Sequence, residues 1–231
     1  KHPLVDVIHH DHANFKRDYG DARYVLDLYQ ISLKDGMSGS LGYGRNTYDF
    51  QEGTMIFTRP GQVITTQHKR LEGEITGWSL YFHPDLIRKS SLGKSIKGYS
   101  FFSYDVHEAL HVSDEEKESL NEIVGKIEKE LSQNIDRHSQ KLIIANIELL
   151  LDYCTRYYDR QFYTRTNLNK DLVTKFEQLI RDYYTSEKQT EYGIPTVQYC
   201  GEQLGMSPNY LSDLLKKETG RTAIDHIHLF V

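Results

Sequence analysis

The sequence predicts an α+β protein that has an N-terminal antiparallel β-barrel, a helical hairpin and a C-terminal all-α subdomain. Short apolar runs separated by glycine-containing turns occupy residues 15–82, two amphipathic patterns follow within residues 113–162, and two short helical patterns flank Gly205. Alternation with a period of two indicates strands, and a period of 3.6 residues indicates helices. We therefore expect a barrel domain over residues 1–112, a hairpin over 113–166 and a helical subdomain over 167–231.

The strand candidates of the first region are residues 24–33, 54–58 and 75–82. In the last of these, Trp78, Leu80 and Phe82 share one face, while Gly77, Ser79 and Tyr81 share the other. Several short strands within residues 15–82 predict a small barrel or a jelly roll.

Two helices are expected after residue 112. Ser113 and Glu116 have the spacing of a capping box at a helix start. One apolar stripe follows, formed by Leu120, Ile123, Val124, Ile127 and Leu131. The second helix, over residues 139–158, has two apolar rows, which are Ile143, Ile147, Leu150 and Cys154 in one and Leu142, Leu149 and Tyr153 in the other. The second row predicts packing against a further surface, with Tyr157 as a partly exposed neighbour.

A polar stretch at residues 167–171 is the best candidate for a domain boundary. Leu172, Phe176, Leu179 and Ile180 then predict a helix that braces the C-terminal pair. Residues 185–193 are expected to form a polar loop.

The C-terminal pair is the most informative feature of the chain. Val197, Cys200 and Leu204 recur at helical spacing, Gly205 ends the first helix, and Ser207-Pro208 begins the second as N-cap and first helical residue. Leu211, Leu214 and Leu215 form the inner side of the second helix. The outward residues are then Asn209, Tyr210, Ser212, Asp213 and Lys216. This arrangement is typical of a helix that enters a DNA major groove, and the alternative is an ordinary helical hairpin.

Residues 202–222 (EQLGMSPNYLSDLLKKETGRT) resemble the first helix-turn-helix of the AraC/XylS family of bacterial transcription regulators. The matching positions are Gly205, Ser207, Pro208, Tyr210 and Leu211, followed by residues 216–220. Residues 77–87 (GWSLYFHPDLI) resemble the end of that family's sensor barrel. The resemblance implies a cupin-like barrel that binds a small-molecule effector, a hairpin that forms a homodimer, and a DNA-binding domain whose second motif is absent here. For the hairpin, the alternative is an intramolecular role in which it closes the barrel.

The resemblance and the helix spacing together assign roles on double-stranded DNA. Asn209, Ser212 and Asp213 are expected to face base edges, while Tyr210, Lys216 and Lys217 lie near phosphates. Ser207, the N-cap of this helix, is also expected to contact DNA. The chain carries a net charge of −5, and residues 170–231 contain 7 basic and 9 acidic side chains. We therefore expect these residues alone to bind DNA poorly, because phosphate contacts supply much of the affinity.

Catalysis and metal binding are not expected. The His-x-His pair and later glutamate of metal-binding cupins are missing, because residues 37–48 contain no histidine and His68, His83 and His107 stand singly. Adjacent side chains of the cluster His9-His10-Asp11-His12 diverge, and no nucleophile with a base is evident. We expect no enzyme activity, no cofactor and no metal. A cupin-type enzyme and a protein-interaction module remain as alternatives.

A ligand-binding barrel needs apolar walls with a few polar groups. The candidates for the effector are Tyr29, Arg45, Arg59, His68, Trp78 and Tyr81. Cys154 and Cys200 lie in apolar helical patterns, which predicts buried thiols. The sequence contains no membrane-spanning run and no secretory signal pattern, so we expect a cytoplasmic protein that does not contact membranes.

Overall fold

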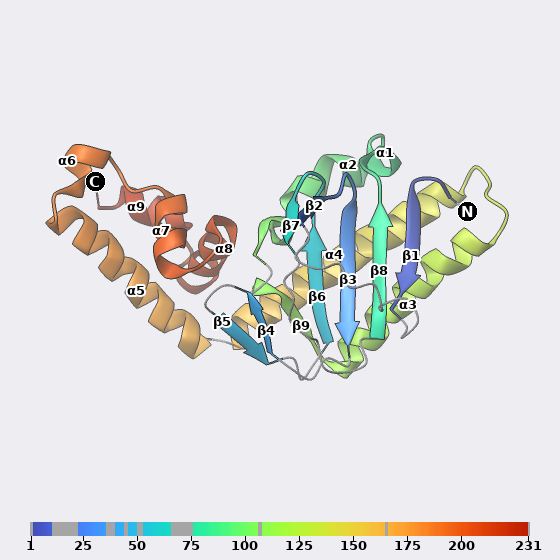
Figure 1. Ribbon diagram of the computed structural model, residues 1–231, viewed down its shortest axis with the longest axis horizontal. Coiled ribbons are helices and arrows are strands. Elements are labelled where there is room, and N and C mark those ends of the chain that lie inside the picture. Colours follow the sequence, from blue (N-terminus) through green and yellow to red (C-terminus); the bar gives the residue numbers. More distant parts are fainter. Residues whose placement is uncertain are drawn as a thin grey trace. The chain divides into compact units, whose positions relative to one another are not determined.

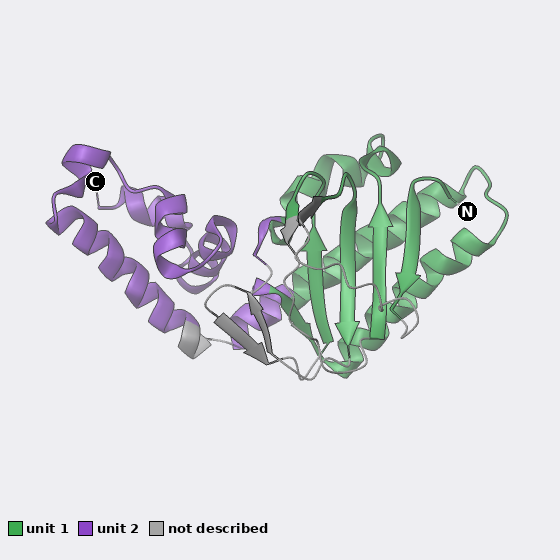
Figure 2. Cartoon of the chain, viewed as in Figure 1, with its two compact units in different colours: residues 1–102, 109–157 green, residues 103–108, 158–231 purple. Residues whose placement is uncertain are grey.

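A computed structural model describes residues 2–10, 23–35, 40–43, 46–49, 53–65, 76–105, 108–164 and 166–230 (Figure 1). The chain divides into two compact units (Figure 2). Residues 1–102 and 109–157 form the sheet unit, and residues 103–108 and 158–231 form the helical unit. The predicted α+β class is confirmed. Each unit combines two separate stretches of the sequence, because residues 103–108 and the end of a long helix belong to the helical unit.

The sheet unit contains a five-stranded antiparallel sheet with the order β1-β8-β3-β6-β9. Its strands are Val5–His9 (β1), Thr76–Phe82 (β8), Tyr29–Asp35 (β3), Gly53–Thr58 (β6) and Leu110–Val112 (β9). Two separate strand pairs are Arg23–Val25 (β2) with Val63–Thr65 (β7), and Ser40–Tyr43 (β4) with Asn46–Asp49 (β5). Across the residues that the structure describes, the five-stranded sheet does not close, so a closed barrel stays a prediction.

The two faces of the sheet differ in chemistry, and the strand register explains why. Ile31 pairs with Phe57 and Leu80, and Leu33 pairs with Met55 and Trp78, so these side chains share one face. All of them are buried. Alternate residues point to the opposite face. The predicted common face of Trp78, Leu80 and Phe82 is therefore consistent with the register, and this face forms the core of the unit.

Two long helices lie behind the sheet in Figure 1, Asp114–Ser132 (α3) and Ser139–Thr164 (α4). The capping box of Ser113 and Glu116 is confirmed, as is the buried stripe of Leu120, Ile123, Val124 and Ile127. Shorter elements connect β8 to β9. They are Pro84–Ile87 (α1), Ser91–Ser95 (α2), Ile96–Gly98 (η1) and Ser100–Ser103 (η2).

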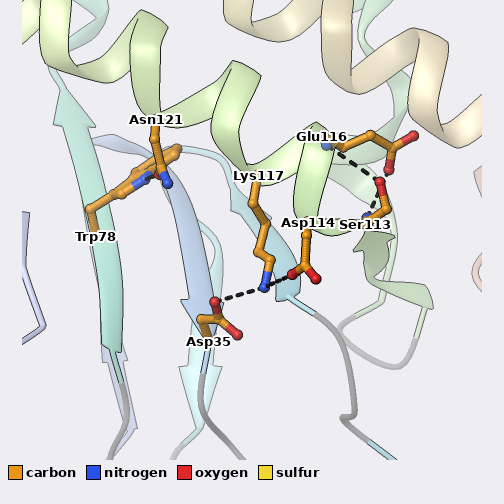
Figure 3. Close-up of polar contacts among 7 residues, drawn as sticks. All are labelled: Asp35, Trp78, Ser113, Asp114, Glu116, Lys117 and Asn121. Atoms are coloured by element: carbon orange, nitrogen blue, oxygen red, sulfur yellow. Dashed lines mark hydrogen bonds and ion pairs between the residues drawn. The ribbon is translucent and has the colours of Figure 1, made fainter.

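Polar contacts fix α3 against the apolar face of the sheet (Figure 3). Lys117 Nζ lies 2.9 Å from Asp35 Oδ2 and 2.7 Å from Asp114 Oδ1. Hydrogen bonds to Asp114 and Asp35 raise the pKa of Lys117. The indole nitrogen of Trp78 donates to Asn121 Oδ1 at 2.8 Å. Trp78 and Asp35 therefore point toward α3.

The outward row of α4 is confirmed in part. Leu142 and Leu149 are 48% and 41% exposed, so the sheet unit leaves them uncovered. Tyr157 is only 6% exposed, and the prediction that it is a partly exposed neighbour is wrong. Its position three residues after Cys154, which is fully buried, turns its ring to the packed side of the helix.

The helical unit consists of α5 (Thr166–Thr185), α6 (Lys188–Tyr192), α7 (Val197–Leu204), α8 (Pro208–Thr219) and α9 (Ala223–His228), with the end of α4. The predicted boundary at residues 167–171 lies inside α5, and the predicted loop 185–193 contains α6. Asn169 explains the first error, because this polar residue is buried. Its Nδ2 donates to Phe162 O at 2.6 Å and to Glu218 Oε1 at 2.8 Å.

The core of the helical unit lies between α5, α7 and α8. Its buried side chains include Leu172, Phe176, Ile180, Cys200, Leu211, Leu214 and Leu215. Leu179, predicted in the same stripe, is half-buried. None of the described helices combines the length and the apolar character needed to cross a membrane.

Candidate nucleic-acid interface

The turn between α7 and α8 is built by residues with specific backbone requirements. Gly205 follows α7 with φ of 69°, in the left-handed region that glycine adopts at low cost. The Ser207 hydroxyl accepts from Tyr210 N at 3.3 Å, and Pro208 occupies the first turn of α8. The predicted glycine stop, serine N-cap and proline start are all confirmed. α8 ends at Gly220 with φ of 78°.

Close packing of α7 on this turn depends on Gly201. A Cβ atom at this position would lie 2.6 Å from the carbonyl oxygen of Met206, and Met206 N donates to Gly201 O at 2.9 Å. Because both contacts involve backbone atoms, no side-chain rotation could make room. This requirement of Gly201 is not among the features predicted above. The glycine inside an otherwise regular helical pattern was the available signal.

The outward side of α8 is less open than the spacing predicts. Asn209 and Lys216 are exposed, and Ser212 is half-buried, with its hydroxyl 3.4 Å from Ala223 N. The prediction that Tyr210 faces outward is wrong, because this side chain is 6% exposed. Its ring packs against Tyr104 and Phe162, with centroids 5.2 and 5.1 Å away.

Two predicted DNA contacts already bind groups from another part of the helical unit, residues 103–105 and 108, which we call the strap. Glu108 accepts from Ser207 N at 2.7 Å and from Ser207 Oγ at 2.5 Å. The Tyr104 hydroxyl donates to Asp213 Oδ2 at 2.6 Å. Glu108 and Ser207 are 3% and 4% exposed. These contacts join residues about a hundred positions apart, so the sequence alone gave no sign of them.

Lys217, the predicted phosphate contact, forms an ion pair with Asp159 of α4 at 2.7 Å. Both side chains are about half exposed, so the pair contributes little to stability and can separate readily. Arg221 and Lys216 are exposed and provide further positive charge at the same end of α8. The cations of this surface are few, in line with the acidic balance of residues 170–231.

The effector candidates do not form one group. Trp78 lies on the helix-covered face of the sheet, and the Tyr29 ring stacks on Phe82 with a centroid distance of 5.0 Å. Tyr81 belongs to the opposite face, and Arg59 is exposed. Arg45 and His68 lie outside the described residues. The structure thus separates Trp78 from Tyr81, as the alternation of the strand predicts.

The face of the sheet that bears Tyr81 has a polar centre, in which Ser32 and Ser79 are buried while Gln30 and Tyr81 are half-buried. Ser32 Oγ lies 2.6 Å from Ser79 Oγ, which is 2.8 Å from His10 Nε2. Gln30 Nε2 donates to Ser32 Oγ at 2.7 Å. Lys34 lies on the same face, because it follows Ser32 by two residues in β3. A connected polar cluster with buried hydroxyls at its centre is a better candidate for an effector site than the predicted set.

Burial changes the protonation of this polar face. Burial, with smaller contributions from Lys34 and His9, lowers the pKa of His10 to about 4. Burial also lowers the pKa of Lys34. His10 is therefore neutral near pH 7 and its ring accepts or donates according to the tautomer.

Cys154 and Cys200 are buried free thiols. Burial raises the pKa of Cys200 to about 11 and also raises that of Cys154, which disfavours the reactive thiolate. Within the part of the chain that the structure describes, no group of three His, Cys, Asp or Glu side chains is placed to hold a metal ion.

No protein-family model and no curated protein sequence matches this chain. The resemblance to AraC/XylS regulators therefore depends on the residues quoted for it, chiefly 202–222.

Proposed function

We propose that this protein is a ligand-responsive transcription regulator of the AraC/XylS type, in which α7 and α8 form a helix-turn-helix and α8 contacts double-stranded DNA. The observation that supports this most is the turn between the two helices, which lies within the stretch that resembles the family. Gly205 is the C-cap of α7, Ser207 is the N-cap of α8, and Pro208 is in the first turn of α8. Asn209 and Lys216 are exposed on α8, as a helix that reads a major groove requires.

In this proposal the sheet unit is a cupin-like sensor. The effector is a small molecule that contacts the polar face formed by Ser32, Ser79, His10 and Lys34, because hydrogen-bonding groups cluster there and the two serines are buried. The exposed leucines of α4, Leu142 and Leu149, supply the contact of a homodimer.

A cleavage experiment tests DNA contact by α8 directly. Both native thiols are buried, so a cysteine introduced by Asn209→Cys can be labelled alone with an iron chelate that cuts nearby DNA. Lys175→Cys, at an exposed position of α5, is the matched control. We expect cuts in bound duplexes, selected at low salt from a randomised pool, from position 209 and far fewer from position 175. Equal cutting from both positions would contradict the assignment of α8.

A further inference from the structure

The strap occupies the part of α8 that DNA contact requires. Resting on the function proposed above, we infer that the strap is an intramolecular competitor of DNA, whose Glu108 carboxylate takes the place of a DNA phosphate at the start of α8. The DNA-binding form is then one in which Glu108 and Tyr104 have left α8.

The Glu108 contact is the first step of this inference. A helix N-terminus binds phosphate because its free N–H groups and its dipole favour an anion. α8 has 12 residues, and at its start the Ser207 N–H and hydroxyl both donate to the Glu108 carboxylate. The carboxylate is almost fully buried there, so it is held by protein on its other sides. A phosphate cannot use these two donors until the carboxylate leaves.

The same strap also blocks base readout, through a contact made by Tyr104. An aspartate on a reading helix recognises cytosine by accepting from its amino group. In this structure Asp213 Oδ2 instead accepts from the Tyr104 hydroxyl at 2.6 Å. The Tyr104 ring also lies edge-on to Tyr210 and to Tyr158, at centroid distances of 5.2 and 5.3 Å. Tyr104 thus holds Asp213, a predicted base contact, and also packs against Tyr210 of the same helix.

The position of the strap in the chain links it to the sheet unit. Phe102 precedes the strap and Ala109 follows it, and both belong to the sheet unit, whereas the strap packs in the helical unit. β9 begins at Leu110, two residues after Glu108. A shift of β9 or η2 is therefore transmitted covalently to Glu108 and Tyr104. An effector that favours the shifted form would favour the DNA-binding form to the same extent.

The test compares the full chain with the double variant Tyr104→Phe, Glu108→Gln. These changes keep the size of both side chains while they remove the hydroxyl donor and the carboxylate charge. Glu116→Gln is the matched control, since Glu116 accepts from Ser113 N at 3.0 Å in the capping box of α3. Anisotropy titrations use a labelled pool of randomised duplexes at low salt. Amide hydrogen exchange at Ser207 reports whether the strap has left α8, because the Ser207 N–H donates to Glu108.

We expect the double variant to bind the pool about tenfold more tightly and to exchange the Ser207 amide faster, with neither change in Glu116→Gln. Faster exchange without tighter binding would overturn the inference and leave the proposed function standing, provided that the unaltered chain binds. Unchanged exchange would also overturn it, because the strap would not be the group that protects Ser207. If the double variant unfolds, the single variant Tyr104→Phe takes its place in the same binding and exchange measurements, since it keeps the aromatic packing.

If the unaltered chain and all variants fail to bind any duplex although the Ser207 amide is released, the proposed function fails. In that case the cleavage experiment at position 209 fails as well, which separates this outcome from a failure of the strap alone.

Discussion

Gly201→Ala should destabilise the helical unit, although alanine is the better helix former. In a helix interior this change normally stabilises by about 1 kcal/mol. At Gly201 the new Cβ would lie 2.6 Å from Met206 O, a backbone atom in the turn that leads to Ser207. Relief requires movement of α7 or of the turn, and such overpacking costs about 1–3 kcal/mol. We therefore expect a net loss of stability of up to about 2 kcal/mol.

Gly125→Ala is the matched control, because Gly125 lies in α3 and a Cβ there meets nothing within 4 Å. It should stabilise the sheet unit by about 0.5–1 kcal/mol. Urea unfolding followed by Trp78 fluorescence reports the sheet unit, since Trp78 is the only tryptophan. Hydrogen exchange of buried α8 amides such as that of Leu211 reports the helical unit. If Gly201→Ala slowed exchange in α8, the close approach of α7 to the turn would be refuted.

Three further outcomes are expected. The low pKa of His10, about 4 against an ordinary 6.5, means that the unfolded chain binds the proton first, so the stability of the sheet unit should fall as pH drops from 6.5 toward 4. Urea midpoints at several pH values measure this, and His10→Gln should flatten the slope. Asn121→Leu leaves the indole N–H of Trp78 without its acceptor, which should cost about 1–3 kcal/mol, measured by the fluorescence midpoint. Leu149→Glu should produce a monomer in sedimentation if α4 forms the dimer, whereas Ile135→Glu, exposed outside the α4 row, should not. A monomeric unaltered chain would end the dimer hypothesis.

Local features of the fold were predictable because their causes are local. The caps at Ser113, Gly205 and Ser207 depend on residues within one turn of chain, and their sequence signals are specific. The apolar face of β8 followed from strict alternation. Errors occurred where tertiary contacts overrode polarity. The polar stretch at residues 167–171 became part of α5 because Asn169 finds buried partners in Phe162 and Glu218.

The candidate site was predictable only in part for a related reason. Helical periodicity separates the inner from the outer side of α8, but it says nothing about what covers the outer side. Tyr210 was assigned to the outer side, and the Tyr104 and Phe162 rings bury it. Glu108 carries no sequence signal that connects it with Ser207.

The contacts of α8 also bear on the acidic balance of the chain. In a protein that binds DNA constitutively, carboxylates beside the reading helix would repel the DNA phosphates and weaken the affinity for DNA. Here Glu108 and Asp159 lie against Ser207 and Lys217, where their charges satisfy donors that DNA would otherwise use. Departure of the strap would free the donors of Ser207, and separation of the exposed ion pair would free Lys217. Acidic residues in this unit therefore fit the proposed DNA-binding function if they act as removable substitutes for phosphate, and the salt dependence of binding should be steeper in the strap variant than in the unaltered chain.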